Sequence, residues 1–202
     1  MLKELFESFF YHSFNKVQGK VLMLNERSEI GDFSLVDQNA CRDCRDVCCN
    51  NKDLREQLKL HSNQITYILS IDQVFSFIND NLGERCDYLL EGADSVILVE
   101  MSCITSNYVE GKRQKARKQL SNTIDLLFAN PMVKSHIEKK KYHYVVFSWK
   151  ETFPDETEMD DAEKSMAGMT VMTDEVYSPD NESIFDYGFK YREIRYPDVL
   201  EC

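Results

Sequence analysis

The chain has 202 residues, of which 43% are hydrophobic, and a formal net charge of -11 at pH 7. This length suits one domain with a sizeable core. No apolar run approaches the ~20 residues that span a membrane, and residues 1–14 contain acids, which a secretory signal avoids. With seven glycines and no glycine-rich phosphate loop, ATP or NAD binding is not expected. The sequence therefore predicts a soluble, cytoplasmic protein.

The negative charge gathers at the C-terminal end. Fifteen acids and four bases fall in residues 151–202, whereas acids and bases balance in residues 1–150. We therefore expect a core, 1–150, followed by an acidic extension, 151–202. Within the extension, 151–183 predicts a long exposed loop, because it is acidic and interrupted by proline. Residues 188–197 alternate apolar and charged side chains, which predicts a half-buried edge strand that returns to the sheet.

The N-terminal part predicts helices and strands in alternation. Residues 2–14 have apolar side chains at helical spacing, and 20–27 read as a short strand. The second half of 32–60 is expected to be helical. Residues 64–80 fit a strand followed by either a short helix or a second strand. On the expected helix within 32–60, the inward residues would be Val47, Leu54 and Leu58.

Four cysteines lie within nine residues: Cys41, Cys44, Cys48 and Cys49. Thiolates at such short spacing could bind Zn²⁺ or an iron–sulfur cluster. Zinc sites usually split into two separated pairs, and the same spacing also describes one face of a helix, so simple packing is favoured. An odd total of seven cysteines argues against a disulfide framework.

Two short apolar strands and a turn bring two acids together. Residues 86–92 predict a strand that begins near Asp87, and 95–103 predict a second strand that contains Glu100, with a turn at 92–94. The two carboxylates should meet at one edge of the sheet. Mg²⁺ is commonly held by one or two carboxylates together with phosphate oxygens of a substrate. The pattern therefore points to a divalent cation and a phosphate-containing ligand.

A basic helix and a core strand follow this hairpin. Residues 111–128 form an amphipathic pattern with Pro131 just past its end, and 141–150 predict a core strand, so the order is strand, strand, helix, strand. The expected inward residues of the helix are Ala116, Leu120, Ile124, Leu127 and Phe128. The bases expected to contact nucleic-acid phosphates are Lys112, Arg113, Lys115, Arg117 and Lys118, with the lysine run 139–141 beside them. A solvated helix face and a polar loop would explain the same charges.

These elements resemble the PD-(D/E)XK nuclease superfamily. The resemblance covers roughly 86–150 and rests on Cys-Asp-Tyr-Leu-Leu from Cys86, on Val-Glu-Met-Ser from Val99, and on Ala116…Gln-Leu…Asn-Thr-Ile in the helix. It implies an α/β fold with a restriction-endonuclease-like core, in which a mixed sheet is flanked by helices. Ser102 stands where the family has a lysine that assists the attacking water.

The resemblance implies roles for particular residues. Asp87, Glu100 and the Met101 carbonyl would bind Mg²⁺ or Mn²⁺. Lys115 or Lys118 would replace the missing lysine. A further group of the expected site is Gln119, which would orient reacting groups, although a structural glutamine is the favoured explanation of that position. A further acid on the first core helix would be Glu56.

The sequence is compatible with two main functions. In the first, the chain is a metal-dependent nuclease. In the second, Ser102 marks lost chemistry, and the chain is an inactive nuclease-like subunit that binds nucleic acid or protein. Proteins similar to this one often serve prokaryotic antiviral defence or restriction systems, so we expect a protein partner, such as an ATPase, or a homo-oligomer. A small module that contacts only protein through its acidic tail is a third, weaker hypothesis.

Overall fold

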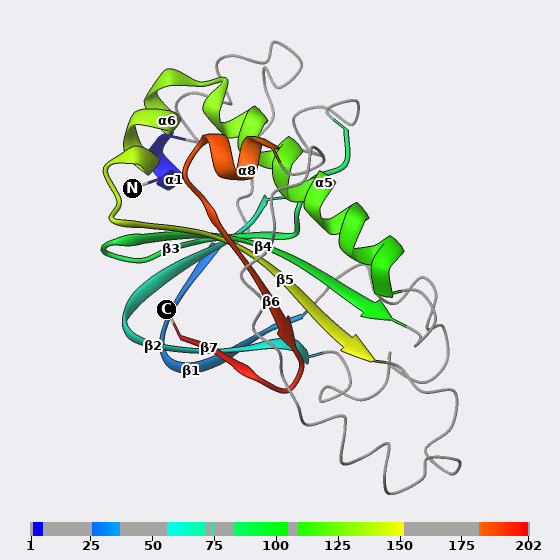
Figure 1. Cartoon of the computed structure of the whole chain (residues 1–202). Coiled ribbons are helices and arrows are strands. Elements are labelled where there is room, and N and C mark those ends of the chain that lie inside the picture. The colour runs from blue at the N-terminus through cyan, green and yellow to red at the C-terminus, as the bar shows by residue number, and fades with distance from the viewer. Residues whose placement is uncertain are drawn as a thin grey trace, which may run out of the picture.

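A computed structural model describes residues 2–5, 26–36, 56–71, 74, 83–104, 109–151 and 182–201. This part of the chain forms a mixed sheet and several helices, so the fold is α/β (Figure 1). The strands are β1 (Glu26–Val36), β2 (Glu56–Ser70), β3 (Tyr88–Glu91), β4 (Ser95–Ile104), β5 (Tyr142–Glu151), β6 (Lys190–Arg195) and β7 (Val199–Glu201). The helices are α1 (Leu2–Leu5), α5 (Val109–Phe128), α6 (Pro131–Glu138) and α8 (Glu182–Asp186).

The strand pairing changes from antiparallel to parallel in the middle of the sheet. Strands β1 to β4 pair in sequence order and antiparallel, whereas β5 pairs parallel to β4, and β6 parallel to β5. Helices α5 and α6 make the connection from β4 to β5, as a parallel pair requires. The predicted order of strand, strand, helix and strand over the central part of the chain is confirmed.

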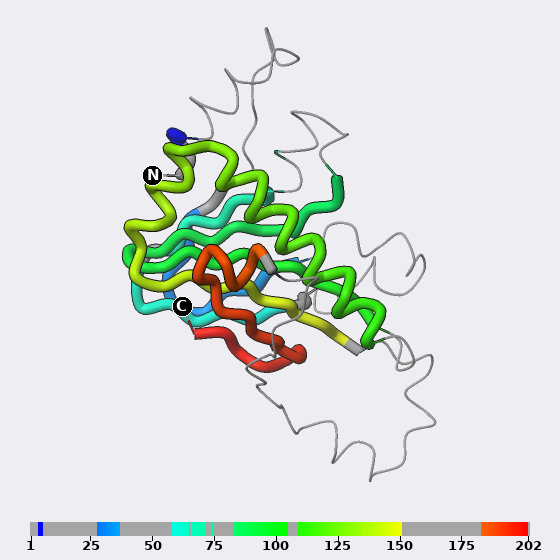
Figure 2. Tube along the Cα trace, turned by 45° about the horizontal axis from the view of Figure 1, so that its top comes forward, coloured from blue at the N-terminus to red at the C-terminus, as the bar shows by residue number. Residues whose placement is uncertain are grey.

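The long strand β2 lets the sheet fold over on itself. Its C-terminal residues 67–70 pair with β3, whereas residues 59–61 pair with β7, the last strand of the chain. Because β7 follows β6 after a short turn, the chain returns across the sheet to β2 (Figures 1 and 2). A hydrophobic cluster with members from β1, β2, β4 and β7 fills the space between the two layers.

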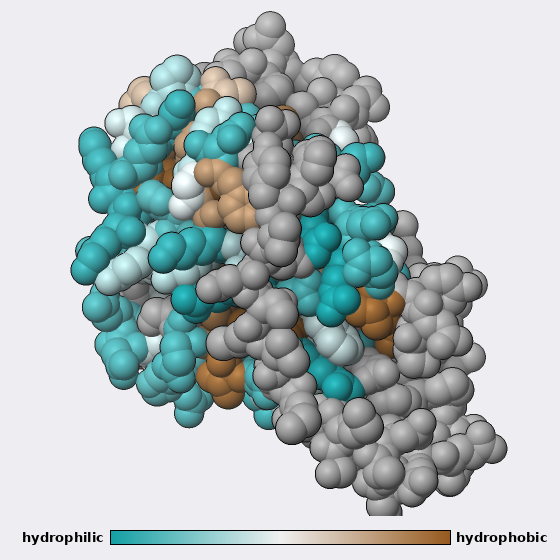
Figure 3. Space-filling model, viewed as in Figure 1, coloured by the Kyte–Doolittle hydropathy of each residue, from teal (hydrophilic) through white to brown (hydrophobic). Residues whose placement is uncertain are grey.

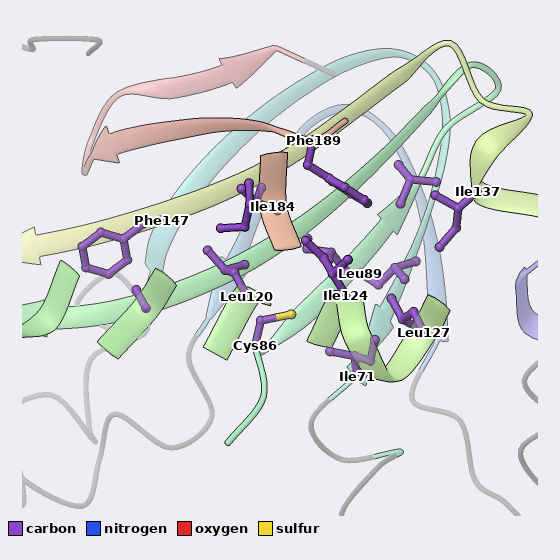
Figure 4. Close-up of a cluster of buried hydrophobic side chains, with 14 of the residues drawn as sticks. Ile71, Cys86, Leu89, Leu120, Ile124, Leu127, Ile137, Phe147, Ile184 and Phe189 are labelled. Atoms are coloured by element: carbon purple, nitrogen blue, oxygen red, sulfur yellow. The ribbon is translucent and has the colours of Figure 1, made fainter. Parts of the chain in front are cut away.

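A larger cluster lies between the other face of the sheet and the helices (Figure 4). In β4, Val96 and Leu98 belong to this cluster, whereas Ile97 and Val99 belong to the cluster inside the fold-over. Successive side chains of a strand point to opposite faces. Both faces of β4 are therefore buried, which explains its almost continuous apolar sequence.

Several predictions for the central region are confirmed. The helix predicted for 111–128 is α5, and all five of its expected inward residues are buried. The strand predicted for 141–150 is β5. The returning strand within 188–197 is β6, which pairs with β5 at the end of the strand order. These elements combine strong periodicity with clear turn residues, so local pattern was sufficient to find them.

The prediction of a helix in the second half of 32–60 is wrong for residues 56–60. These residues open β2, with Leu58 and Leu60 buried on one face. Glu56 therefore lies on a strand opposite Val36, not on a core helix. Leu, Gln and Lys favour helices in isolation, but pairing with β1 and β7 buries the alternate leucines, and that burial outweighs the local preference.

Helix α6 was not predicted, because Pro131 was interpreted only as marking the end of the preceding helix. The Asn130 side chain accepts hydrogen bonds from the backbone amides of Met132 and Val133, and Pro131 occupies the first turn. Asparagine before the first turn and proline within it form a helix start signal. The buried residues Val133 and Ile137 then pack this helix against the core.

Other predictions fall wholly or partly outside the described residues. They include the cysteine cluster, residues 6–14 of the N-terminal helix, residues 20–25, Val47 and Leu54, and most of 151–183. Within 64–80, the strand extends to Ser70, and Ile71 and Val74 are helical. In the part of the chain that the structure describes, no helix combines the length and the apolar character needed to cross a membrane.

Candidate functional site

Asp87 lies immediately before β3 and is bonded to β4 on both sides of Glu100. Its backbone amide donates to the Val99 carbonyl at 3.0 Å, and its Oδ2 accepts a 2.8 Å hydrogen bond from the Met101 amide. These two hydrogen bonds hold Asp87 beside the part of β4 that contains Glu100, although the two acids are 13 positions apart in the sequence. The two carboxylates were predicted to meet at one edge of the sheet; β3 and β4 are inner strands, and the hydrogen bonds place Asp87 beside this inner segment of β4.

Glu100 and Ser102 share the face of β4 that α5 covers. Val96, Leu98 and Ile104 alternate with the residues of the other face, and positions 100 and 102 continue their row. Glu100 is only 7% exposed, whereas Ser102 is half-buried and its hydroxyl lies 3.4 Å from the Cys103 carbonyl. The row therefore carries a buried acid and a small neutral hydroxyl.

The Met101 carbonyl points to the same edge of β4 as Asp87. In an extended strand, the amide and the carbonyl of one residue point to the same side, which is how paired residues exchange both hydrogen bonds. Because the Met101 amide donates to Asp87, its carbonyl faces the Asp87 side too. Two carboxylates and a carbonyl are hard oxygen donors of the kind that Mg²⁺ and Mn²⁺ take, so these residues fit such an ion.

Three polar side chains of α5 hold the segment that leads into Asp87. Gln119 Nε2 donates to the Arg85 carbonyl at 2.9 Å, and Asn122 Nδ2 donates to the Glu84 carbonyl at 3.3 Å. The buried Thr123 hydroxyl accepts the Cys86 amide at 2.9 Å. These bonds fix the backbone directly before Asp87, so we call the three residues the α5 clamp.

The α5 clamp changes the interpretation of Gln119. Its amide is bonded to a backbone carbonyl two residues before Asp87, which matches the structural alternative for this glutamine. Asn122 and Thr123 belong to the sequence pattern that carries the resemblance, and the sequence predicts no role for them. The α5 clamp could have been predicted from the polar side chains on the inward flank of the helix. Buried polar groups need a hydrogen-bond partner, and the backbone is the usual one.

The arginines of α5 pair with Glu193 of strand β6. Arg113 Nε lies 2.9 Å from Glu193 Oε2, and Arg117 lies 4.0 Å from the other oxygen of the same carboxylate. Glu193 is 6% exposed and also accepts a 3.1 Å hydrogen bond from the Tyr191 hydroxyl. Burial and the neighbouring Glu193 carboxylate raise the pKa of Tyr191 well above its usual range. Both arginines, expected to bind nucleic acid, thus attach α5 to β6.

The lysines of α5 lie elsewhere on the helix. Lys115 is half exposed and lies 3.6 Å from Glu84, beside the segment held by the α5 clamp. Lys118 is exposed and stands two positions from both Ala116 and Leu120, which face the sheet, so it lies on the outer side of the helix. Lys112 is half-buried in the first turn. Of the two lysines predicted to assist a reaction, Lys115 is on the flank nearer to Asp87.

A second group of charges lies at the other end of β3 and was missed in the sequence. Glu91 Oε1 lies 2.6 Å from His136 Nε2 and 3.0 Å from Lys140 Nζ, and Glu91 is 4% exposed. Lys140 also donates to the carbonyls of Gly92 and Ala93 in the hairpin turn. The group ties α6 to the hairpin. It could not be predicted because α6 itself was not.

Neither the geometry nor known proteins identify a complete metal centre. In the residues that the structure describes, no group of three or more His, Cys, Asp or Glu side chains is arranged to hold a metal ion. Comparison of the chain with protein-family models, with curated proteins and with solved structures found no match. The candidate site is therefore defined by Asp87, Glu100 and Met101, supported by the α5 clamp.

Proposed function

We propose that this chain is a nuclease-like protein of the PD-(D/E)XK type that binds a divalent cation at Asp87 and Glu100 and acts on nucleic-acid phosphodiesters. The observation that carries the proposal is the bonding of Asp87 to β4 on both sides of Glu100. The order of an antiparallel hairpin, a helix and a parallel strand also agrees with the core that the resemblance implies.

Asp87, Glu100 and the Met101 carbonyl would hold Mg²⁺ or Mn²⁺, and such an ion polarises a phosphoryl oxygen and lowers the pKa of bound water. The residues of the chain have separate tasks. The Met101 amide orients the Asp87 carboxylate, and the α5 clamp holds the backbone that carries it. Lys115, on the adjoining flank of α5, supplies the positive charge that Ser102 does not.

An inactive nuclease-like subunit is the second candidate function, and two observations favour it. Ser102 offers only a neutral hydroxyl where a cation would stabilise developing charge. Arg113 and Arg117 are engaged with Glu193 rather than turned toward a phosphate. In this case, the protein would bind a nucleic acid or a partner, such as the ATPase of a defence or restriction system, without cleaving.

The first test is calorimetric titration of Mn²⁺ into the full chain and into Asp87→Asn and Glu100→Gln. The matched control is Asp94→Asn, an exposed acid in the turn at the other end of the hairpin. We expect heat of binding for wild type and the control and none for the two site variants. Equal binding by all four proteins would place the ion elsewhere and contradict the proposed site.

Cleavage assays on DNA and RNA then separate the two candidate functions. In the active case, wild type cleaves, and Lys115→Ala loses most activity while Lys118→Ala, on the outer side of α5, keeps it. In the inactive case, wild type binds Mn²⁺ without cleaving, and Ser102→Lys gains activity. Absence of cleavage by both wild type and Ser102→Lys would refute the assignment of a nuclease-type site.

A further inference from the structure

Two tyrosine rings stack on the face of the sheet opposite α5. Tyr142 and Tyr144 are two positions apart in β5 and so share a face, and their ring centroids lie 6.3 Å apart with an interplanar angle of 14°. Tyr144 packs partly against the hydrophobic cluster inside the fold-over, whereas Tyr142 is 41% exposed. The pair therefore forms an anchored aromatic platform whose outer ring is open to solvent.

Each ring carries a cation from a different part of the chain. The Arg192 guanidinium lies 4.0 Å from the centroid of Tyr144, and Lys141 Nζ lies 4.9 Å from the centroid of Tyr142. Lys190 is the register partner of Tyr144 in the parallel pairing of β5 and β6, so it emerges on the same face. The Tyr142 hydroxyl raises the pKa of Lys141 and favours its charged form. We call these five residues the tyrosine platform.

The tyrosine platform is positive although the protein is negative. Residues 139–150 contain four lysines and no acid, in a chain with a net charge of -11. Lys140 is bound to Glu91, and Lys150 is half-buried beside the Tyr196 ring at the far end of β5, so the exposed lysines next to Tyr142 are Lys139 and Lys141. Among the coloured residues of Figure 3, hydrophilic side chains predominate, and the hydrophobic patches are small and separate. Local positive charge is complementary to a polyanion.

We propose that the tyrosine platform binds single-stranded nucleic acid, with a base stacked on Tyr142 and the surrounding cations against neighbouring phosphates. Exposed aromatic rings beside a basic groove are how proteins bind single strands without sequence preference. In a duplex, the bases already stack on one another. An acidic peptide or an anionic lipid surface would meet the cations but would make no use of the tyrosine rings.

This inference names a partner class for the proposed function but concerns a separate surface. Glu100 is on the face of the sheet that α5 covers, and the tyrosine platform is on the other face. Binding there needs neither a metal ion nor Asp87. The inference can therefore be tested without the proposed metal site.

The test is fluorescence anisotropy of dye-labelled oligothymidine and oligouridine in EDTA, with the full chain. We expect Tyr142→Ala to lose at least about five-fold in affinity, since one stacked base contributes about 1–3 kcal/mol, and Tyr142→Phe to keep the wild-type affinity. The matched control is Tyr187→Ala, because Tyr187 is also exposed and has Lys134 5.4 Å from its ring, on another part of the surface. Circular dichroism checks that each variant is folded.

Salt dependence tests the cations. Replacing Lys141 and Arg192 by alanine should reduce the slope of log affinity against log salt by about 0.7 per cation. Absence of oligonucleotide binding by wild type, or equal losses for Tyr142→Ala and Tyr187→Ala, would refute the inference. Tighter binding of heparin or of a duplex, with no effect of Tyr142→Ala, would show a purely ionic surface and refute it as well. Asp87→Asn should leave this affinity unchanged, and Tyr142→Ala should leave the Mn²⁺ titration unchanged, so each proposal can fail alone.

Discussion

Glu193 and Asp87 both lie near α5, but different groups hold them. Glu193 is 6% exposed, and a 2.9 Å bond joins it to the Arg113 guanidinium. Asp87 is half-buried, and a 2.8 Å hydrogen bond joins it to the neutral amide of Met101. A guanidinium balances the negative charge that it binds, whereas an amide orients a carboxylate without cancelling its charge. The Arg113–Glu193 pair joins α5 to β6, whereas the Met101 amide orients the Asp87 carboxylate and leaves its charge in place.

The same contrast separates the two ends of β3. At the hairpin end, His136 and Lys140 hold Glu91 and so fix α6. At the opposite end, the α5 clamp holds only the backbone before Asp87. Helices thus attach to this sheet through buried carboxylates at Glu91 and Glu193 and, beside the candidate site, through the neutral hydrogen bonds of the α5 clamp and the exposed Lys115–Glu84 pair. The four predictions below test this difference, from the largest expected effect to the smallest.

Glu193→Gln should give the largest loss of stability. Removing one partner of a buried ion pair leaves the other uncompensated, at about 3–5 kcal/mol for full burial, and we expect about 2–4 kcal/mol because Arg113 is one-third exposed. Urea unfolding measures this loss. The control is Glu110→Gln, which removes the exposed partner of the same arginines and should cost less than about 1 kcal/mol. Equal losses would mean that Glu193 is no more structural than a surface acid.

Thr123→Val should combine a smaller loss of stability with weaker metal binding. Valine has the shape of threonine but leaves the buried Cys86 amide without its acceptor, which costs about 1–3 kcal/mol. Because Asp87 is the next residue, its carboxylate should be less well placed, and the Mn²⁺ affinity should fall. Thr123→Ser keeps the hydroxyl and is the control. A destabilised variant with unchanged Mn²⁺ affinity would show that the α5 clamp does not serve the site.

Asn130→Ala should cost about 1 kcal/mol, as the loss of a helix N-cap usually does. Its side chain accepts two amides in the first turn of α6, the helix that presents His136 to Glu91. Asn130→Asp keeps the acceptor and should restore the stability in urea unfolding. Neither change should alter Mn²⁺ binding, since α6 lies at the Glu91 end of the hairpin. A fall in Mn²⁺ affinity for Asn130→Ala would connect the two ends of β3.

The sequence was most informative where local pattern and tertiary structure agree. The hairpin with Asp87 and Glu100 and strand β5 are apolar runs, and helix α5 is buried on the face that its periodicity indicates. Residues 56–60 favour a helix by propensity but become a strand because β1 and β7 pair with them from distant parts of the chain. Such long-range pairing leaves little local signal.

The candidate site was predictable in its acids but not in the surroundings of its cations. Cross-strand proximity of Asp87 and Glu100 follows from the length of one turn. The position of Arg113 opposite Glu193 depends on where β6 docks, 80 residues away, and no local pattern encodes that contact. A basic helix in sequence therefore divides in space into arginines that bind the protein itself and lysines nearer to the solvent.

The smallest effect concerns an exposed counterpart of the Glu91–His136 pair. His61 Nδ1 lies 2.6 Å from Asp32 Oδ1, the same distance as in the buried pair, but the Asp32 side chain is 90% exposed. The hydrogen bond to Asp32 raises the pKa of His61 above its ordinary value of 6.5. A raised folded-state pKa means that the stabilisation is fully present below pH 6.5 and is lost as the pH rises through the folded-state value.

Asp32→Asn should therefore lower the melting temperature slightly in mildly acidic buffer and hardly at all in alkaline buffer, as measured by calorimetry across that range. High salt should shrink the acidic difference further, because exposed pairs are screened. In a chain that also carries His61→Asn, the effect of Asp32→Asn should no longer depend on pH. A difference that grows toward alkaline pH would have the wrong sign for a protonated His61. It would show that Asp32 acts through another group of the β1–β2 pair.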